Sequence, residues 1–382
     1  MSRVLDALGA GDGLTRYVGG AVRDELLDLP VSDIDLATRL RPEEVVERLE
    51  GAKIRPVPTG IDHGTITAVS SGHPYEITSL RRDVSTDGRR ATVAFTDDWE
   101  EDAARRDFTI NALSADPVSG QIFDYFGGSE DLHARRVRFI GEPLERIAED
   151  HLRILRFFRF HARFGKGPPE PDALEACSLR ANDLMALSRE RIADELLKLL
   201  AVEDPSPTVG IMLDHGILRP VLPEIAQSAV SQLQSLVATE NSAGIARDPL
   251  RRLGALLPRD SDLAERIATR LKLSNKARKR LACAANPEAI TDPHATAYYS
   301  GVECAVDRLL LQDRPDVAAN IARWQSPKLP ISGGSLIEQG LTQGPIVAKA
   351  LQAIERQWVE RGFPEKGEFE RIVEAVLAAA RS

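Results

Sequence analysis

The stretch RYVGGAVRDELLDLPVSDIDL, residues 16–36, contains the features that decide the fold. It begins as the end of a strand, turns at Gly19 and Gly20, and continues as a helix that Pro30 stops. Glycines let a backbone approach a ligand closely, and the N–H groups that open a helix can bind phosphate oxygens. Such a turn more often only connects two elements, and this one has neither a P-loop nor a dinucleotide-binding pattern.

Two aspartates follow this turn. Asp33 and Asp35 lie two apart on an expected strand, so their carboxylates project from the same face. Two such carboxylates repel each other, and a divalent cation bound between them is one reason to tolerate the repulsion. The alternative is a solvated strand end, which explains most Asp-x-Asp pairs.

Strand-like and helix-like patterns occupy different parts of the chain. Short β-type runs fall at 65–69, 75–79, 92–95 and 137–140, with a helical pattern at 42–49. Apolar residues with the helical period of about 3.6 then recur at 143–164, 188–202, 262–283, 297–312 and 345–361. We predict an α+β protein with an α/β head at 1–140, a helical neck at 141–205, and a helical body and tail at 206–382.

The composition of the 382 residues excludes several classes of protein. Hydrophobic residues make up 43%, but no apolar run reaches the roughly 18–20 residues of a membrane helix. The net charge of −9 argues against nonspecific coating of nucleic acid. The spacing of the three cysteines fits no CxxC site, and we expect buried thiols at Cys177, Cys283 and Cys304. The N-terminus lacks a signal-peptide pattern. We expect a cytoplasmic protein without membrane contact or an obligate protein partner.

Four segments in a fixed order resemble one enzyme family. Gly-Gly, twelve residues and Asp-x-Asp resemble the nucleotidyltransferase superfamily that includes DNA polymerase beta. Three more segments narrow the resemblance: RRDFTINA at 105–112, FDYFGGSEDL at 123–132 and EDHLRILRFFRF at 149–160. Together they resemble class II tRNA nucleotidyltransferases, the CCA-adding enzymes, and bacterial poly(A) polymerases.

The resemblance implies roles for individual residues. Asp33 and Asp35 would hold Mg²⁺, and Glu76 is the candidate for a third catalytic carboxylate, with a solvent-facing strand residue as the alternative. The nucleotide would be bound or braced by Gly19, Gly20, Arg23, Arg106, Asp107, Asn111, Arg156 and Arg159. Asp150 and Arg153 would read the base, with Glu149 orienting Arg153.

Hydrogen-bond chemistry supports this base-reading role. A carboxylate accepts from an exocyclic amine, and a guanidinium donates to a ring nitrogen. Cytosine and adenine present an amine beside such an acceptor, whereas uracil and guanine present a carbonyl beside an N–H. The Arg residues of 153–163 recur on one helix face without an acid from 151 to 169, which favours an anionic ligand over a solvated charge face.

A second basic segment lies in the predicted body. Residues 266–287 contain seven Lys or Arg and no acid. We predict RNA contact by Arg270, Lys272, Lys276, Arg278 and Lys279, with an incidental solvated face as the alternative. In the head, the charged stretch 81–90 matches a flexible loop of CCA-adding enzymes, the alternative being an exposed hairpin.

The sequence thus predicts a Mg²⁺-dependent enzyme that adds CCA to the 3′ end of tRNA from CTP and ATP. The alternatives are a bacterial poly(A) polymerase and the A-adding member of a split CC/A-adding pair, which share the head motifs. A helical RNA-binding protein without activity is disfavoured, because the acidic and base-reading residues are all present.

Overall fold

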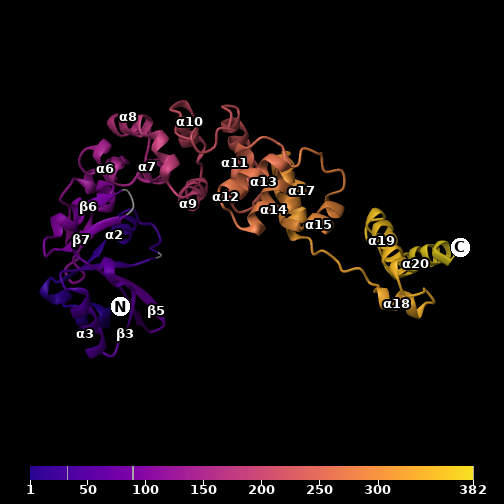
Figure 1. Ribbon diagram of the computed structural model, residues 1–382, viewed down its shortest axis with the longest axis horizontal. Coiled ribbons are helices and arrows are strands. Elements are labelled where there is room, and N and C mark those ends of the chain that lie inside the picture. Colours follow the sequence, from indigo (N-terminus) through magenta and orange to yellow (C-terminus); the bar gives the residue numbers. More distant parts are fainter. Residues whose placement is uncertain (32, 88–89, 382) are drawn as a thin grey trace. The chain divides into compact units, whose positions relative to one another are not determined.

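The computed structural model describes residues 1–31, 33–87 and 90–381 (Figure 1). The chain folds into two compact units, Met1–Pro223 and Glu224–Ser382. The predicted domain boundaries at 140 and 205 lie within the first unit and stay predictions. Among the described residues, none of the helices combines the length and the apolar character that a bilayer span requires.

The first unit begins with a mixed sheet whose strands are ordered β3-β4-β5-β2-β1-β8-β9. Its strands are β1 (Thr15–Val18), β2 (Asp35–Thr38), β3 (Arg55–Gly60), β4 (Thr65–Ser70), β5 (His73–Ser79), β8 (Ser114–Ala115) and β9 (Ile122–Phe123), and β6 (Arg81–Asp87) and β7 (Arg90–Phe95) form a separate hairpin. The helices around it are α1 (Ser2–Ala7), η1 (Ala10–Asp12), α2 (Gly20–Leu26), α3 (Pro42–Gly51), η2 (Ile61–His63), α4 (Trp99–Ala104), η3 (Thr109–Asn111) and α5 (Gly128–His133). This mixture of strands and helices confirms the predicted α/β head.

Strand pairing brings distant residues of the head together. β2 runs antiparallel to β1 and parallel to β5, and its register places Asp35 opposite Glu76. In β4 every second side chain is buried, and Ile66 packs with Ile77 of β5 and Leu36 of β2 in one apolar core. The core thus fixes the two acidic residues on neighbouring strands.

Three predictions about the head need correction or qualification. Asp33 precedes β2, so the prediction that it shares a strand with Asp35 is wrong, because the ladders to β1 and β5 extend no further than Asp35. The predicted strand at 137–140 is wrong as well: only Phe139 forms an isolated bridge, to Phe108. The three apolar residues of the run, Val137, Phe139 and Ile140, are buried without belonging to a strand. The stretch 81–90 contributes to the β6–β7 hairpin, and positions 88–89 of that prediction lie outside the described residues.

The helices after the head carry the predicted neck (Figure 1). They are α6 (Pro143–Glu149), α7 (Arg153–Phe164), α8 (Pro171–Leu179), η4 (Ala181–Ala186), α9 (Arg189–Leu200) and α10 (Ser206–Asp214). The single helix predicted at 143–164 is wrong, because Asp150 is extended, with φ −150° and ψ 108°. Its carboxylate accepts from the Leu152 N–H at 3.1 Å, a local bond that competes with the helical ladder.

The described residues of the second unit form helices and no strands. They are α11 (Ala229–Ala243), α12 (Pro249–Leu256), α13 (Ser261–Arg270), α14 (Asn275–Ala284), α15 (Pro293–Ser300), α16 (Val302–Leu311), α17 (Pro315–Arg323), α18 (Gly333–Glu338), α19 (Pro345–Glu360) and α20 (Lys366–Arg381). The helix predicted at 262–283 is interrupted where Ser274 caps α14, and that at 297–312 where Gly301 has φ 89°. Each interruption lets two short helices pack against each other.

A buried ion-pair network and a disulfide join helices of this unit. Arg251 donates to Glu240 at 2.7 Å and to Asp307 at 2.8 Å, and Asp307 is 1% exposed. The expectation of unpaired buried thiols is wrong for two cysteines: Cys283 of α14 and Cys304 of α16 form a disulfide with Cα atoms 6.0 Å apart, and Cys283 is only partly buried. Helix packing aligns residues whose spacing in the sequence gave no sign of pairing. Cys177 is buried and free, as expected.

Candidate active site

A cavity of about 440 Å³ in the first unit gathers most of the predicted nucleotide-binding residues. It is lined by Gly19, Gly20, Arg23, Asp35, Arg106, Asp107, Asn111, Asp150, Arg153, Arg156 and Phe160. These residues come from the glycine turn and α2, β2, the loop after α4, η3, the break between α6 and α7, and the neck helix α7. Asp33, Glu76 and Arg159 were also predicted for the site but are not among the lining residues.

The glycine turn leaves space for an arginine side chain. Gly19 has φ +66°, a left-handed conformation that glycine adopts without strain. A Cβ atom at Gly19 would lie 2.9 Å from Nη1 of Arg106, whereas one at Gly20 would meet its nearest side chain, Arg23, at 3.5 Å. The same Nη1 donates to the carbonyl oxygen of Asn111 at 3.3 Å. Gly19 therefore leaves room for the Arg106 guanidinium across the turn.

Two of the predicted catalytic carboxylates stand on adjacent strands. Burial raises the pKa of Asp35, and the charge of Asp33 raises it further, while Arg106 lowers it. Burial also raises the pKa of Glu76, with a further contribution from the charge of Asp35. Across the described residues no three His, Cys, Asp or Glu side chains form a complete metal site.

The predicted base-reading pair lies at the break between α6 and α7. Asp150 accepts a hydrogen bond from Nη2 of Arg191 on α9 at 2.7 Å. Arg153 pairs with Glu149 and donates to the Arg146 carbonyl oxygen at 2.9 Å. Both side chains are therefore oriented by protein contacts.

The other arginines of the neck have acidic partners that are distant in sequence. Arg156 donates to Asp107 at 2.7 Å, and Arg159 donates to the buried Glu195 at 2.6 Å. Burial alone would raise the pKa of Asp107, but Arg156 and hydrogen bonds from Asn111 and Phe108 bring it below its usual value. Residues 151–169 contain no acid. Carboxylates from other segments of the folded chain nevertheless pair with the arginines of this basic face.

Sequence reasoning missed three residues of this region as site residues. Phe160 lines the cavity, and the guanidinium groups of Arg156 and Arg159 lie 5.4 and 4.3 Å from its ring centre. Arg191 and Glu195 lie one turn apart on α9 and hold Asp150 and Arg159. A signal was present for Glu195, since this acid sits between Ile192 and Leu199 on the buried face of α9.

The predicted RNA-binding residues lie on α13, α14 and the segment between them, in the second unit. Arg270 donates to both oxygens of Glu224, at 2.8 and 2.7 Å, and Arg278 pairs with Glu265 at 3.4 Å. Lys272, Lys276 and Lys279 are exposed, and Lys276 lies 3.5 Å from Glu303. Three of the five predicted residues, Arg270, Lys276 and Arg278, are thus in ion pairs, and the side chains of the three lysines are exposed.

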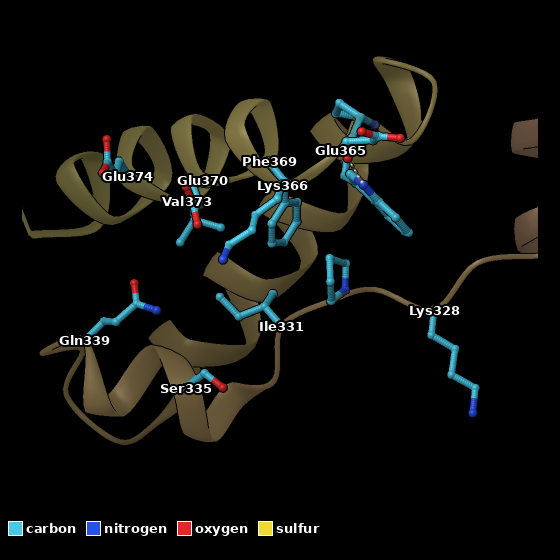
Figure 2. Close-up of a pocket in the computed structure, with 13 residues that line it drawn as sticks. Lys328, Ile331, Ser335, Gln339, Glu365, Lys366, Phe369, Glu370, Val373 and Glu374 are labelled. Atoms are coloured by element: carbon cyan, nitrogen blue, oxygen red, sulfur yellow. Dashed lines mark hydrogen bonds between the residues drawn. The ribbon is translucent and has the colours of Figure 1, made fainter.

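A larger cavity, of about 810 Å³, lies in the same unit beside α18 and α20 (Figure 2). Glu365, Glu370 and Glu374 are on its wall, and the Lys328 side chain points away from it. None of the predicted site residues lines it. Lys366 lines the cavity as well, so its wall carries both acidic and basic side chains.

Comparison with known proteins agrees with the geometry. Residues 15–138 match the Poly A polymerase head domain, and residues 168–228 match the probable RNA and SrmB-binding site of polymerase A. Human mitochondrial CCA tRNA nucleotidyltransferase 1 is 35% identical over 367 residues, covering 91% of this chain and 83% of that protein. The CCA-adding enzyme of Latilactobacillus sakei is 32% identical over 405 residues, covering 99% and 96%. The chain belongs to the class II family of CCA-adding enzymes and bacterial poly(A) polymerases.

Solved structures of this family share the fold of the chain. The crystal structure of Bacillus stearothermophilus CCA-adding enzyme in complex with CTP has a TM-score of 0.79 at 27% identity, covering 100% of this chain and 98% of that one. Thermotoga maritima CCA-adding enzyme complexed with tRNA has a TM-score of 0.67 at 20% identity, covering 99% and 95%. The predicted family and fold class are confirmed.

Proposed function

We propose that the protein adds C, C and A to the 3′ end of tRNA, using CTP and ATP and releasing pyrophosphate. One observation carries the proposal: a single cavity is lined by the glycine turn, by Asp35 and by the base-reading pair Asp150 and Arg153. Such a cavity has a place for a triphosphate, a catalytic centre and a base. Relatives named as CCA-adding enzymes over most of the chain support the same reaction.

In the proposed reaction the tRNA 3′-hydroxyl oxygen attacks the α-phosphorus of the nucleotide. A new P–O bond forms, the bond from the α-phosphorus to the pyrophosphate oxygen breaks, and the hydroxyl proton passes to water. Arg23, Arg106 and Arg156 line the cavity and would offset the negative charge of the triphosphate. Their fixed guanidinium groups would keep the α-phosphate in place for attack.

The carboxylates fit a role in holding Mg²⁺. Asp33 and Asp35 would bind the ion, and Glu76, opposite Asp35 on β5, is the candidate for a third ligand. Carboxylate oxygens are the ligands that Mg²⁺ prefers. Burial raises the pKa of Asp35, and the charge of Asp33 adds a smaller contribution that a bound cation would offset. When bound, Mg²⁺ would stabilise negative charge on the reacting phosphate and the leaving pyrophosphate.

The base would be selected at the break between α6 and α7. The Asp150 carboxylate would accept from the exocyclic amine of cytosine or adenine, and Arg153 would donate to the adjacent ring nitrogen. Uracil or guanine would leave buried donors and acceptors unpaired, which costs binding energy. Both side chains line the cavity, which is what this role requires.

Incubation of tRNA lacking its 3′ CCA with CTP, with ATP or with both, followed by 3′-end sequencing, tests the function. CTP alone should give CC ends, and both nucleotides should give CCA ends. Long A tails would indicate a poly(A) polymerase, and A added only to tRNA that already ends in CC would indicate an A-adding enzyme. Unchanged ends in every reaction would overturn the proposal in favour of RNA binding without activity.

A further inference from the structure

The backbone around the base-reading pair is not held by a continuous helix. α6 ends at Glu149, Asp150 is extended, and α7 begins at Arg153. Helical hydrogen bonds therefore do not carry the geometry of α6 through to Arg153. Side-chain contacts have to position its guanidinium relative to the rest of the cavity.

Arg146 of α6 makes such contacts. Its Nη2 donates to the carbonyl oxygens of Arg105 and Arg106, at 2.7 and 2.6 Å. Its Nη1 donates to the Glu149 carboxylate at 2.8 Å. The two carbonyls directly follow α4, where a helix leaves acceptors without internal donors. Its side chain is 11% exposed, so Arg146 ties the end of α4 to the end of α6 out of contact with most solvent.

Arg153 is attached to the same groups. It pairs with Glu149, its Nη1 donates to the Arg146 carbonyl oxygen at 2.9 Å, and its Nη2 reaches the Arg105 carbonyl oxygen at 3.3 Å. The two arginines thus share one carboxylate and one carbonyl. Burial lowers the pKa of Arg146, and the nearby positive charge of Arg153 lowers it further. Glu149 and the carbonyls hold these like charges together.

The two arginines differ in their relation to the cavity. Arg153 and Arg106 are among its lining residues, whereas Arg146 is not. Arg146 nevertheless holds the backbone of Arg106 and, through Glu149, the side chain of Arg153. It therefore links the residue expected at the triphosphate to the residue expected at the base.

We propose that Arg146 is a positioning residue that determines base specificity without touching the nucleotide. Arg146 holds the carbonyl groups after α4 and the Glu149 carboxylate in place, and these groups in turn hold Arg153. In this position Arg153 can pair only with a base that has a ring-nitrogen acceptor beside an amine. This inference rests on the proposed function, because it assumes that Arg153 reads the base. Without the clamp, Arg153 can move away from the reading position, and bases that present a carbonyl are rejected less strongly.

Two substitutions test the clamp. Arg146→Lys keeps the positive charge but lacks the planar fork that reaches two carbonyls and a carboxylate together, and Arg146→Ala removes all three contacts. The measurement is kcat/KM for CTP, ATP, UTP and GTP on tRNA lacking its CCA end, with thermal melting of each variant. Arg146→Ala should lower the preference for CTP over UTP on the order of 10-fold or more, and Arg146→Lys by less. If Arg146→Ala does not fold, the lysine variant decides the question.

Arg259 offers a matched control in the second unit. Its guanidinium also bridges two carbonyls at helix ends, those of Ala284 and Leu311 at 2.9 and 2.6 Å, and burial also lowers its pKa. Arg259→Lys should therefore reproduce any loss of stability but leave base preference unchanged.

The outcomes separate the inference from the function. Unchanged preference in a folded Arg146 variant, an equal loss for all four nucleotides, or an equal loss of preference in Arg259→Lys would overturn the positioning role. If the wild-type protein adds neither CMP nor AMP to tRNA, the proposed function fails, and the inference falls with it.

Discussion

Gly19 shows how one backbone position shapes the cavity. Its left-handed φ of +66° strains any other residue, and an added Cβ would lie 2.9 Å from the Arg106 guanidinium. We predict that Gly19→Ala destabilises the protein by about 1–2 kcal/mol and weakens nucleotide binding, because Arg106 must move. Urea unfolding and CTP titration measure the two effects. Gly20→Ala, whose Cβ would have 3.5 Å of room, is the control, and equal effects at both positions would contradict the argument.

Asp150 is expected to act on base choice before it acts on catalysis. Asp150→Ala removes the proposed acceptor for the exocyclic amine and leaves the other lining residues in place. The loss of one charge-assisted hydrogen bond is worth about 1.5–3 kcal/mol, or roughly 10- to 150-fold in preference for CTP over UTP. Ratios of kcat/KM for the four nucleotides measure this change. Asp183→Ala, at an acid of the neighbouring η4, should leave the ratios as they are.

Asp35 links pH to stability. Burial raises the pKa of the Asp35 carboxyl group above the value of about 3.9 that it has in the unfolded chain, so the folded state holds the proton more tightly than the unfolded state does. The contribution of this group to the free energy of unfolding is therefore present below a pH of about 3.9 and is lost as pH rises through the folded pKa. At pH 7 without Mg²⁺ the carboxylate therefore destabilises the fold. We predict that Asp35→Asn raises the melting temperature at pH 7 by roughly 1–3 °C and that the rise disappears near pH 3.5.

The same substitution should lower turnover by about 100-fold or more with little change in tRNA affinity, because a proposed Mg²⁺ ligand is lost. Asp12→Asn, at an exposed acid, should change neither stability nor turnover. An Asp35→Asn protein that is less stable at pH 7, or that keeps near wild-type turnover, would show that the carboxylate has another role.

At the scale of elements, sequence patterns predicted which segments fold but not where they break. The strands at β4 and β5 and the helices α3, α9 and α19 follow local periodicity, because one face of each is buried. At the break, the Asp150 side chain accepts from the Leu152 N–H, a bond that competes with the helix and that hydrophobic periodicity does not predict. The run at 137–140 has the composition of a strand but only one bridge, because core packing also selects the apolar residues Val137, Phe139 and Ile140.

Some residues of the candidate site could be predicted from the sequence, and others could not. Residues carried by motifs, such as Gly20, Asp107 and Arg153, were predicted and line the cavity. Other residues, such as Arg146 and Arg191, hold these lining residues in place through contacts between helices. Arg191, for example, is 41 residues away in the sequence from its partner Asp150. Such partners follow from the fold and not from spacing.

The disulfide between α14 and α16 provides a test of packing at this scale. Cys283 and Cys304 are 21 residues apart, and closing a loop of that size stabilises a protein by about 3 kcal/mol. We predict that a reducing agent lowers the melting temperature of the wild-type protein but not that of Cys304→Ser. Thiol titration of the unreduced, denatured protein should find one reactive cysteine, Cys177. Three reactive thiols would show that the bond does not form in solution.

At the scale of the whole molecule, one segment has a charge opposite in sign to the net charge of the protein. The net charge is −9, yet residues 266–287 contain no acid. The fold neutralises part of this segment, since Arg270 and Arg278 pair with Glu224 and Glu265. The exposed basic residues of the segment are Arg266 and a lysine cluster, which consists of Lys272, Lys276 and Lys279. An acidic protein with a local basic surface is suited to binding one RNA transiently and releasing it.

The lysine cluster should therefore control the salt dependence of tRNA binding. Each phosphate contact releases condensed counterions, so each Lys→Gln change within the cluster should reduce the slope of log affinity against log salt by about 1. Arg270→Gln is the matched control, because its guanidinium is already held by both oxygens of Glu224 and should contribute little to the slope. The Lys276 pair with Glu303 is a single contact between side chains that are 82% and 59% exposed, so a phosphate can replace Glu303. Binding of labelled tRNA at several salt concentrations measures these slopes, and kcat/KM ratios for CTP and UTP should stay constant. If the lysine variants keep the wild-type slope, the cluster is a solvated face and the tRNA is bound elsewhere.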